Sequence, residues 1–161
     1  MLRRMPPLAG LPISVDHVRN LRDRRGPVHG GAYLRERRIA LDCTRGEFPR
    51  IFVHEVAHFI WLRLGNTTRT SYEEVLRVEL AGRARGELGW SAEWRKAALK
   101  AENVECRSQR WREYCCESFC DTAAWLYSGK SQHAEFTLAE RWRLRRKTWF
   151  EVALGGRTLS I

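Results

Sequence analysis

The fold of this chain is decided by the stretch VHEVAHFI, residues 53–60. It lies inside an apolar segment, residues 48–64, whose hydrophobic side chains cover most of the circumference of a helix, and such a helix belongs at the centre of a domain. Positions four apart lie on one face of a helix, so His54 and His58 can both point a ring nitrogen at one metal ion. Glu55 lies beside them, displaced around the helix axis, where its carboxylate can reach a water bound to that ion.

This HExxH pattern is specific enough to guide the rest of the interpretation. With average usages of ~2% for His and ~6% for Glu, chance produces it about once in several hundred chains of this length. Apart from its own His and Glu, the surroundings from Ile51 to Leu62 are uncharged. Two imidazoles and a carboxylate there need a partner, because unpaired buried polar groups are costly. Two imidazoles with an open coordination position suit a catalytic zinc ion.

A zinc enzyme also needs a third protein ligand, and residues 114–121 offer candidates. Glu117 and Asp121 lie one helical turn apart on an otherwise apolar helix, so that Glu117 could bind the metal while Asp121 accepts a hydrogen bond from a liganding histidine. His133 would instead give a three-histidine site. Cys116 and Cys120 also have i, i+4 spacing, and two thiolates would close the coordination shell and make the zinc structural.

The combination of HExxH with a later ExxxD resembles the gluzincin zinc peptidases, in a minimal single-domain form. The compact ImmA/IrrE-type peptidases, which act on transcriptional repressors, are a neighbouring group. The resemblance implies that His54, His58 and Glu117 are the ligands of Zn²⁺. It further implies that Glu55 is the catalytic base and that Asp121 orients His54.

The resemblance also implies where substrate binds. In gluzincins a strand just upstream of the HExxH helix lies along the active-site cleft and pairs with extended peptide, and Arg38–Cys43 occupies that place here. We therefore expect a peptide or protein substrate along Arg38–Cys43. Tyr72, Tyr114 and Tyr127 could donate a hydrogen bond to a developing oxyanion, although each is more typical of a half-buried core residue.

The whole chain, 161 residues long, is predicted to form one α+β domain of zincin-like architecture. Residues 1–12 are rich in proline and are expected to form an irregular arm, with the metallopeptidase domain spanning residues 13–161. Short strands are expected first, within residues 12–21, 32–34 and 38–43. About five helices should follow, near residues 48–64, 71–88, 91–103, 109–128 and from about residue 137 onward. Ser71 and Glu74 form the capping-box signal for the second of these.

The charge is strongly basic, with 29 Lys and Arg against 19 Asp and Glu and a net charge of +10. The dense run Arg141–Lys147, with Trp142 and Trp149 interleaved, could contact nucleic acid or could form a solvated helix face. A DNA-associated regulatory protein with a repressor-directed or inactive peptidase site is therefore one alternative function. A structural zinc domain is the other.

The number of cysteines and the hydropathy of the chain indicate where in the cell the protein is expected. Five cysteines are an odd number without a CxxC pair, which favours reduced intracellular thiols over a disulfide framework. No apolar run approaches the ~18 residues of a membrane span. We expect a soluble, cytoplasmic protein with no membrane partner.

Overall fold

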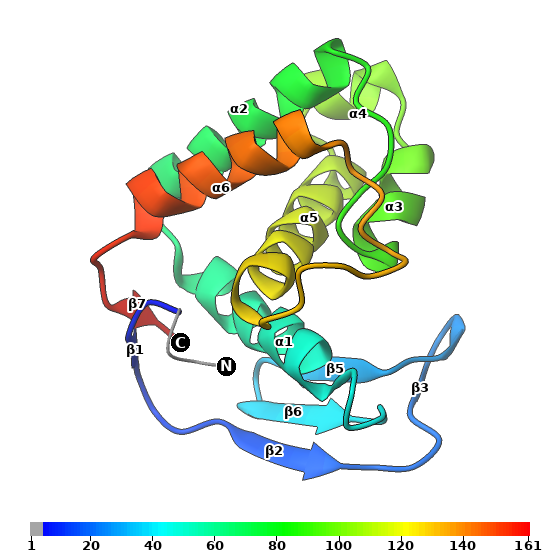
Figure 1. The fold of residues 1–161 in the computed structure, drawn as a ribbon, viewed down its shortest axis with the longest axis vertical. Coiled ribbons are helices and arrows are strands. Elements are labelled where there is room, and N and C mark those ends of the chain that lie inside the picture. Colours follow the sequence, from blue (N-terminus) through cyan, green and yellow to red (C-terminus); the bar gives the residue numbers. More distant parts are fainter. Residues whose placement is uncertain (1–4) are drawn as a thin grey trace.

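The computed structural model describes residues 5–161 and confirms the α+β class, with small sheets preceding the helices (Figure 1). The main sheet has three strands in the order β2 (Ser14–His17), β6 (Arg38–Leu41) and β5 (Gly30–Tyr33). β2 runs parallel to β6, whereas β5 runs antiparallel to it. Both edges of β6 are therefore occupied, and β5 forms one edge of this sheet.

Two short strand pairs accompany this sheet in the described chain. A hairpin joins β3 (Arg22–Asp23) to β4 (Gly26–Pro27), and β1 (Leu8–Ala9) pairs in parallel with β7 (Leu159–Ser160). The second pair corrects the prediction that residues 1–12 are irregular throughout, because Leu8 and Ala9 form a strand; residues 1–4 lie outside the described part. The partner of β1, the strand β7, is more than a hundred residues away in the sequence, so the sequence around β1 does not predict this pairing.

Residues 5–161 contain six helices, one more than predicted: α1 (Phe48–Arg63), α2 (Asn66–Ala81), α3 (Trp90–Ala97), α4 (Ala101–Glu105), α5 (Gln109–Tyr127) and α6 (Glu140–Leu154). The segment predicted as one helix over residues 91–103 divides into α3 and α4 because the chain turns at Ala98. None of these helices is both long and apolar enough to cross a bilayer.

The predicted start of the second helix is wrong. α2 begins at Asn66, directly after Gly65, and Ser71 lies inside it with its hydroxyl donating to the Thr68 carbonyl. The capping-box pattern is therefore coincidental here. α2 also ends earlier than predicted, at Ala81 with Gly82 as its cap, after which Arg83 adopts a left-handed backbone with φ 54°.

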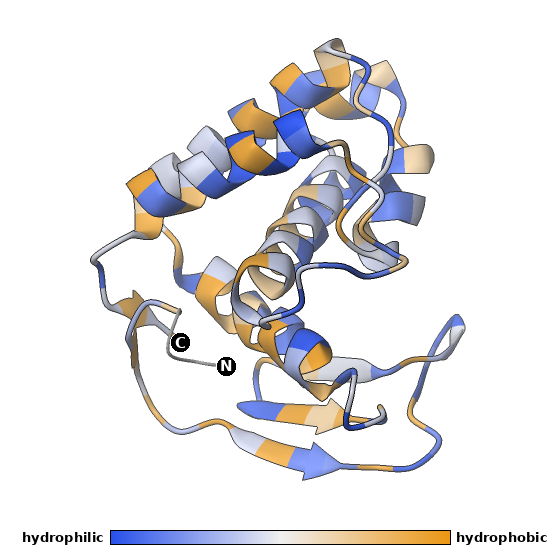
Figure 2. Ribbon diagram, in the orientation of Figure 1, coloured by the Kyte–Doolittle hydropathy of each residue, from blue (hydrophilic) through white to orange (hydrophobic). Residues whose placement is uncertain are grey.

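The helix that carries HExxH lies at the centre of the fold, between the three-stranded sheet and α5 (Figure 1). A proline in the first turn of α1 fits there because its missing N–H has no partner inside the helix. Ile39 and Leu41 of β6 are almost completely buried, as are Val53 and Phe59 of α1. Hydrophobic residues dominate α1 in Figure 2, whereas α2 and α6 mix both kinds, as half-exposed helices do.

Aromatic side chains join α2, α5 and α6. The Tyr72 ring lies 5.6 Å from that of Phe119 and 4.8 Å from that of Trp149. The Tyr72 hydroxyl bonds to the Ser118 carbonyl at 3.1 Å and to the Thr122 hydroxyl at 3.0 Å, so this tyrosine is a core residue rather than an oxyanion donor.

A buried ionic network lies among the same helices. Arg146 of α6 is completely buried and donates to Glu79 of α2 at 2.7 Å and to Glu87 at 2.7 Å, and both glutamates are also completely buried. Arg143 donates to the backbone carbonyl of Phe136 at 2.7 Å. The basic run at residues 141–147 is therefore not one continuous charged surface, since part of it is internal. A nucleic-acid partner stays a prediction from the net charge alone.

Candidate metal centre

Two histidines of α1 lie close to one glutamate of α5. Glu117 Oε2 lies 3.3 Å from His54 Nε2 and 3.9 Å from His58 Nε2. The two imidazole rings, one turn apart, lie 5.0 Å between centroids. The side chains of His54 and Glu117 are 11% and 14% exposed, so this contact is largely screened from water.

These separations match the dimensions of a metal site. Nitrogen and oxygen ligands ~2.0–2.1 Å from a tetrahedral ion lie about 3.3 Å from one another. The Glu117–His54 separation equals that value, and the Glu117–His58 separation exceeds it slightly. Glu117 is therefore closer to the spacing of a shared ligand with His54 than with His58.

In each histidine ring, Nδ1, the nitrogen that does not face Glu117, contacts a side chain of α5. His54 Nδ1 lies 2.8 Å from Asp121 Oδ1, the contact that the ExxxD pattern predicts. His58 Nδ1 lies 3.5 Å from the Cys116 sulfur. Such outer contacts fix the ring orientation of a metal ligand and raise its basicity. Both rings are thereby fixed with Nε2 toward Glu117.

The other candidate ligands, Cys116, Cys120 and His133, differ in their distance from the two histidines. His54, His58 and Cys120 each offer one ligand atom within 4.8 Å of the others, so this group could hold a metal ion. Cys116 instead faces Nδ1 of His58, whereas Glu117 lies nearer Nε2 of that ring. His133 contacts Glu47 at 3.3 Å, at the beginning of α1 rather than in the centre.

The electrostatics of the centre favour positive charge. Burial lowers the pKa of His54, but Asp121 and Glu117 outweigh it and raise that pKa well above its ordinary value. Burial also lowers the pKa of His58. The contacts with Cys116 and Glu117 outweigh this effect and raise the pKa of His58 to about 9. Burial raises the pKa of Glu117, yet the two imidazoles lower it to about 2. Without a metal ion this positive charge is carried by the protonated imidazoles, so a metal would bind here in exchange for their protons.

Glu55 lies beside the two histidines and is 6% exposed. Burial raises its pKa, and the nearby imidazoles oppose that effect. Within residues 5–161 its carboxylate forms no ion pair, in contrast to that of Glu117. An idealised Cβ placed on Gly30 of β5 would lie 2.6 Å from Glu55 Oε1, so the absence of a side chain at Gly30 makes room for this carboxylate.

Asp121 also positions a third helix over the centre. Its Oδ2 accepts a hydrogen bond at 3.1 Å from the backbone N–H of Ala92, in the first turn of α3. The residue that precedes α3 is Gly89, which has no side chain to cap the helix, and a Cβ there would lie 2.2 Å from Asp121 Oδ1. Glu135 accepts from the N–H of Trp90 at 2.8 Å. Two carboxylates from elsewhere in the chain thus cap α3.

One residue of the site was missed by sequence reasoning. Arg95 of α3 donates toward Glu117 Oε1 at 3.1 Å and to the Ser91 carbonyl at 2.8 Å. Because Arg95 occupies Oε1, Glu117 turns Oε2 toward the histidines. Nothing in the pattern of α3 signals this contact, which depends on how α3 packs on α5. For Gly30, in contrast, a signal existed, since paired glycines in a strand often mark a close approach.

Comparison with protein-family models, curated proteins and solved structures finds no match to this chain. The functional assignment therefore depends on the residues of the centre and their geometry. The decisive feature is the proximity of His54, His58 and Glu117.

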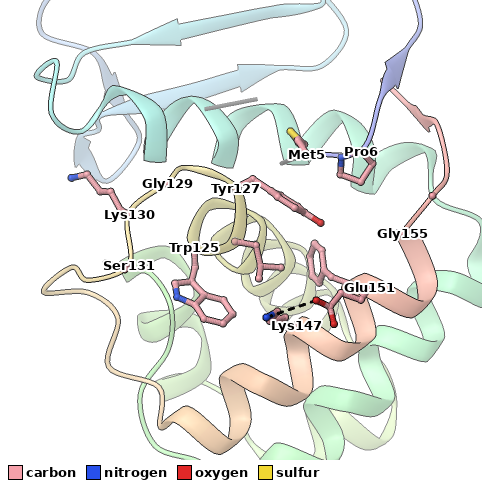
Figure 3. A pocket seen from close by; sticks show the side chains of 13 residues that line it. Met5, Pro6, Trp125, Tyr127, Gly129, Lys130, Ser131, Lys147, Glu151 and Gly155 are labelled. Carbon is pink, nitrogen blue, oxygen red and sulfur yellow. Dashed lines mark ion pairs between the residues drawn. The ribbon is translucent and has the colours of Figure 1, made fainter. Parts of the chain in front are cut away.

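A separate pocket of about 630 Å³ lies between α5 and α6, beneath the N-terminal arm (Figure 3). Trp125, Tyr127 and Phe150 contribute to its apolar lining, and Lys147 pairs with Glu151 at 3.8 Å on its rim. None of His54, His58 and Glu117 lines it. Tyr127 belongs to this pocket, and the Tyr114 hydroxyl bonds to Glu87 at 2.6 Å, so neither tyrosine serves the metal centre.

The expected substrate strand needs a correction. Arg38–Cys43 contains β6, and β6 is paired on both sides, by β2 and by β5. Its backbone therefore has no free edge at which a peptide could add as a further strand. The edge strands of this sheet are β2 and β5, and of the two it is β5 (Gly30–Tyr33) that lies against Glu55.

Proposed function

We propose that this protein is a zinc-dependent peptidase of the kind its HExxH and ExxxD motifs resemble. The observation that supports this function best is the approach of Glu117 Oε2 to the Nε2 atoms of His54 and His58, at 3.3 and 3.9 Å. Two nitrogens and one oxygen are a ligand set of catalytic zinc sites, which keep a fourth position open. Asp121 orients His54, and Cys116 orients His58.

The chemistry divides between the metal and Glu55. Zinc held by the three ligands would supply Lewis-acid polarisation of a water molecule and of a peptide carbonyl. Glu55 accepts a proton on its carboxylate as that water attacks, and later donates it to the leaving amine. Its raised pKa suits this exchange, because a base works best when its pKa lies near the operating pH.

Substrate binds, on this proposal, along the outer edge of β5. The Asp42 N–H donates to the His29 carbonyl at 2.9 Å, so residues 29, 31 and 33 direct their backbone groups toward β6. Gly30 and Ala32 then direct theirs outward. An extended peptide can pair with these free groups, which would carry its backbone past Glu55.

The two glycines of β5 provide a test of this arrangement. We expect Gly30→Ala to lower kcat by about 10²-fold, because its Cβ would displace the Glu55 carboxylate, and small misplacements of a reacting group cost that much. Gly31→Ala is the matched control, since its Cβ would meet the nearest atom, in the Tyr33 ring, at an ordinary 3.5 Å. Peptide hydrolysis by both zinc-loaded variants measures the effect. Equal rates for the two would contradict the proposed position of Glu55.

A second candidate function is a structural metal site. Cys120 supports it, because its thiol could join His54 and His58 as a third ligand in place of Glu117, and one further protein ligand would then close the tetrahedral shell. In that case the metal would stabilise the fold and Glu55 would have no proton to move.

Zinc affinity distinguishes the two candidates. For a peptidase, Glu117→Gln should weaken zinc binding by more than the ~10–100-fold that outer-shell changes cause, because it removes a ligand. Cys120→Ser should leave affinity within a few-fold of the wild type. Competition with a chromophoric chelator gives the affinities, and a peptide-library digest with and without chelator gives the activity. A reversed order of the two variants, with no zinc-dependent cleavage, would establish the structural site instead.

A further inference from the structure

The hairpin β3–β4 is linked to the metal centre through one indole ring. The Arg25 guanidinium carbon lies 3.7 Å from the centre of the Trp94 ring, and that of Arg95 lies 4.1 Å from it. Two guanidiniums this close to one ring centre would overlap on a single face, so they lie on opposite faces. Arg95 in turn contacts Glu117 at 3.1 Å. Arg25 is therefore only one aromatic ring away from a residue that contacts a metal ligand.

The tip of this hairpin carries positive charge that the described residues do not neutralise. Arg22, Arg24 and Arg25 are exposed, and none of them forms an ion pair within residues 5–161. The one acidic residue of the hairpin is Asp23, whose Oδ1 accepts the backbone N–H groups of Arg25 at 2.7 Å and Gly26 at 3.0 Å. Its carboxylate thus shapes the turn and leaves the guanidiniums free.

The hairpin also leads directly into β5, the edge strand that lies against Glu55. β4 ends at Pro27, and β5 begins at Gly30, which lies against Glu55. At ~3.3 Å per residue the intervening chain spans about 10 Å. A long arginine side chain at the hairpin can therefore reach the side chains of a peptide that lies on β5 and passes Glu55.

We propose that Arg25, held against Trp94, makes this site selective for peptides with an aspartate or glutamate within about three positions of the cleaved bond. Stacking on an indole fixes the plane of a guanidinium and leaves its N–H edge open. That edge matches the two oxygens of a carboxylate. The inference rests on the proposed peptidase function and specifies its substrate class.

Peptide binding by the zinc-loaded Glu55→Gln protein tests the inference without requiring turnover. The probes are two fluorescein-labelled extended peptides that differ only in carrying central glutamates or central glutamines, and anisotropy gives their affinities. We expect tighter binding of the glutamate peptide, by up to about fivefold, as for a partly exposed ion pair. Adding Arg25→Gln should abolish that preference. Adding Arg24→Gln, which removes the same charge from the same hairpin without an indole partner, should retain most of it.

The outcomes separate this inference from the function on which it rests. Equal affinity for both peptides, or equal loss of preference in the Arg24 and Arg25 variants, would overturn the role of Arg25 while leaving the peptidase proposal intact. Failure of the zinc-loaded wild type to cleave any library peptide would count against the peptidase, whatever the anisotropy shows. Zinc content should be the same in all of these variants, since Arg25 contacts no ligand directly.

Discussion

A Glu55→Gln variant is expected to lose peptide cleavage by about 10²–10⁴-fold, the usual contribution of a positioned proton-transfer group. Glutamine has the size and shape of glutamate but cannot accept a proton from an attacking water. The side chain is 6% exposed and forms no ion pair within residues 5–161, so the substitution leaves no buried partner unpaired. Its effect should therefore fall on catalysis rather than on folding.

The measurement combines zinc content by mass spectrometry with digestion of a peptide library by both proteins. Zinc bound equally to both, with cleavage by the wild type alone, is the expected result. Glu113→Gln is the control, because Glu113 is an exposed glutamate one turn before Glu117 on α5. Cleavage that persists in the Glu55→Gln protein would reject Glu55 as the base. Loss of zinc from that protein would show that Glu55 has a structural role.

Replacing Arg146 by methionine is expected to destabilise the protein by about 3–5 kcal/mol, the range for removing one partner of a buried ion pair. Arg146 is completely buried and is the shared partner of Glu79 and Glu87, which are completely buried as well. Methionine fills similar space without charge. It would leave Glu79 without its cation, while Glu87 would keep one cation, Lys96 at 3.1 Å, and the hydrogen bond from the Tyr114 hydroxyl.

Urea unfolding followed by circular dichroism gives the change in the free energy of unfolding. Arg145→Met is the control, since Arg145 is exposed on the same helix and its loss should change stability by no more than about 0.5 kcal/mol. Adding Glu79→Gln and Glu87→Gln to Arg146→Met should recover part of the loss, because a neutral buried set avoids uncompensated charge. A loss for Arg146→Met as small as that for Arg145→Met would contradict the network.

The parts of the site that were predicted from sequence depend on spacing within single helices. The i, i+4 separation of His54 and His58 places them on one face wherever the helix lies, and the same holds for Glu117 and Asp121. That the two faces meet follows from burial, because few partners can satisfy so many polar groups inside a core. The α+β class and the central position of α1 follow from hydrophobic periodicity in the same way.

The parts that were missed depend on contacts between distant segments. The central position of β6 follows from its pairing with β2 and β5, which the sequence of β6 alone does not specify. Arg95 and Arg146 occur in sequences that resemble ordinary charged helix surfaces, and only the packing of α3 and α6 assigns them partners. The role of Gly89 is hidden from the sequence for the same reason. The carboxylate that needs a small residue at this position, that of Asp121, comes from another helix.

One carboxylate in this centre serves two structures at once. Oδ1 of Asp121 steadies the ring of His54, while Oδ2 secures the opening turn of α3 through the Ala92 amide. A metal ion bound at His54 would therefore be thermodynamically linked to the local folding of α3, since what anchors the imidazole also anchors that turn. α3 in turn carries Arg95 to Glu117 and Trp94 to the hairpin, so binding of such an ion would also add order to these two contacts.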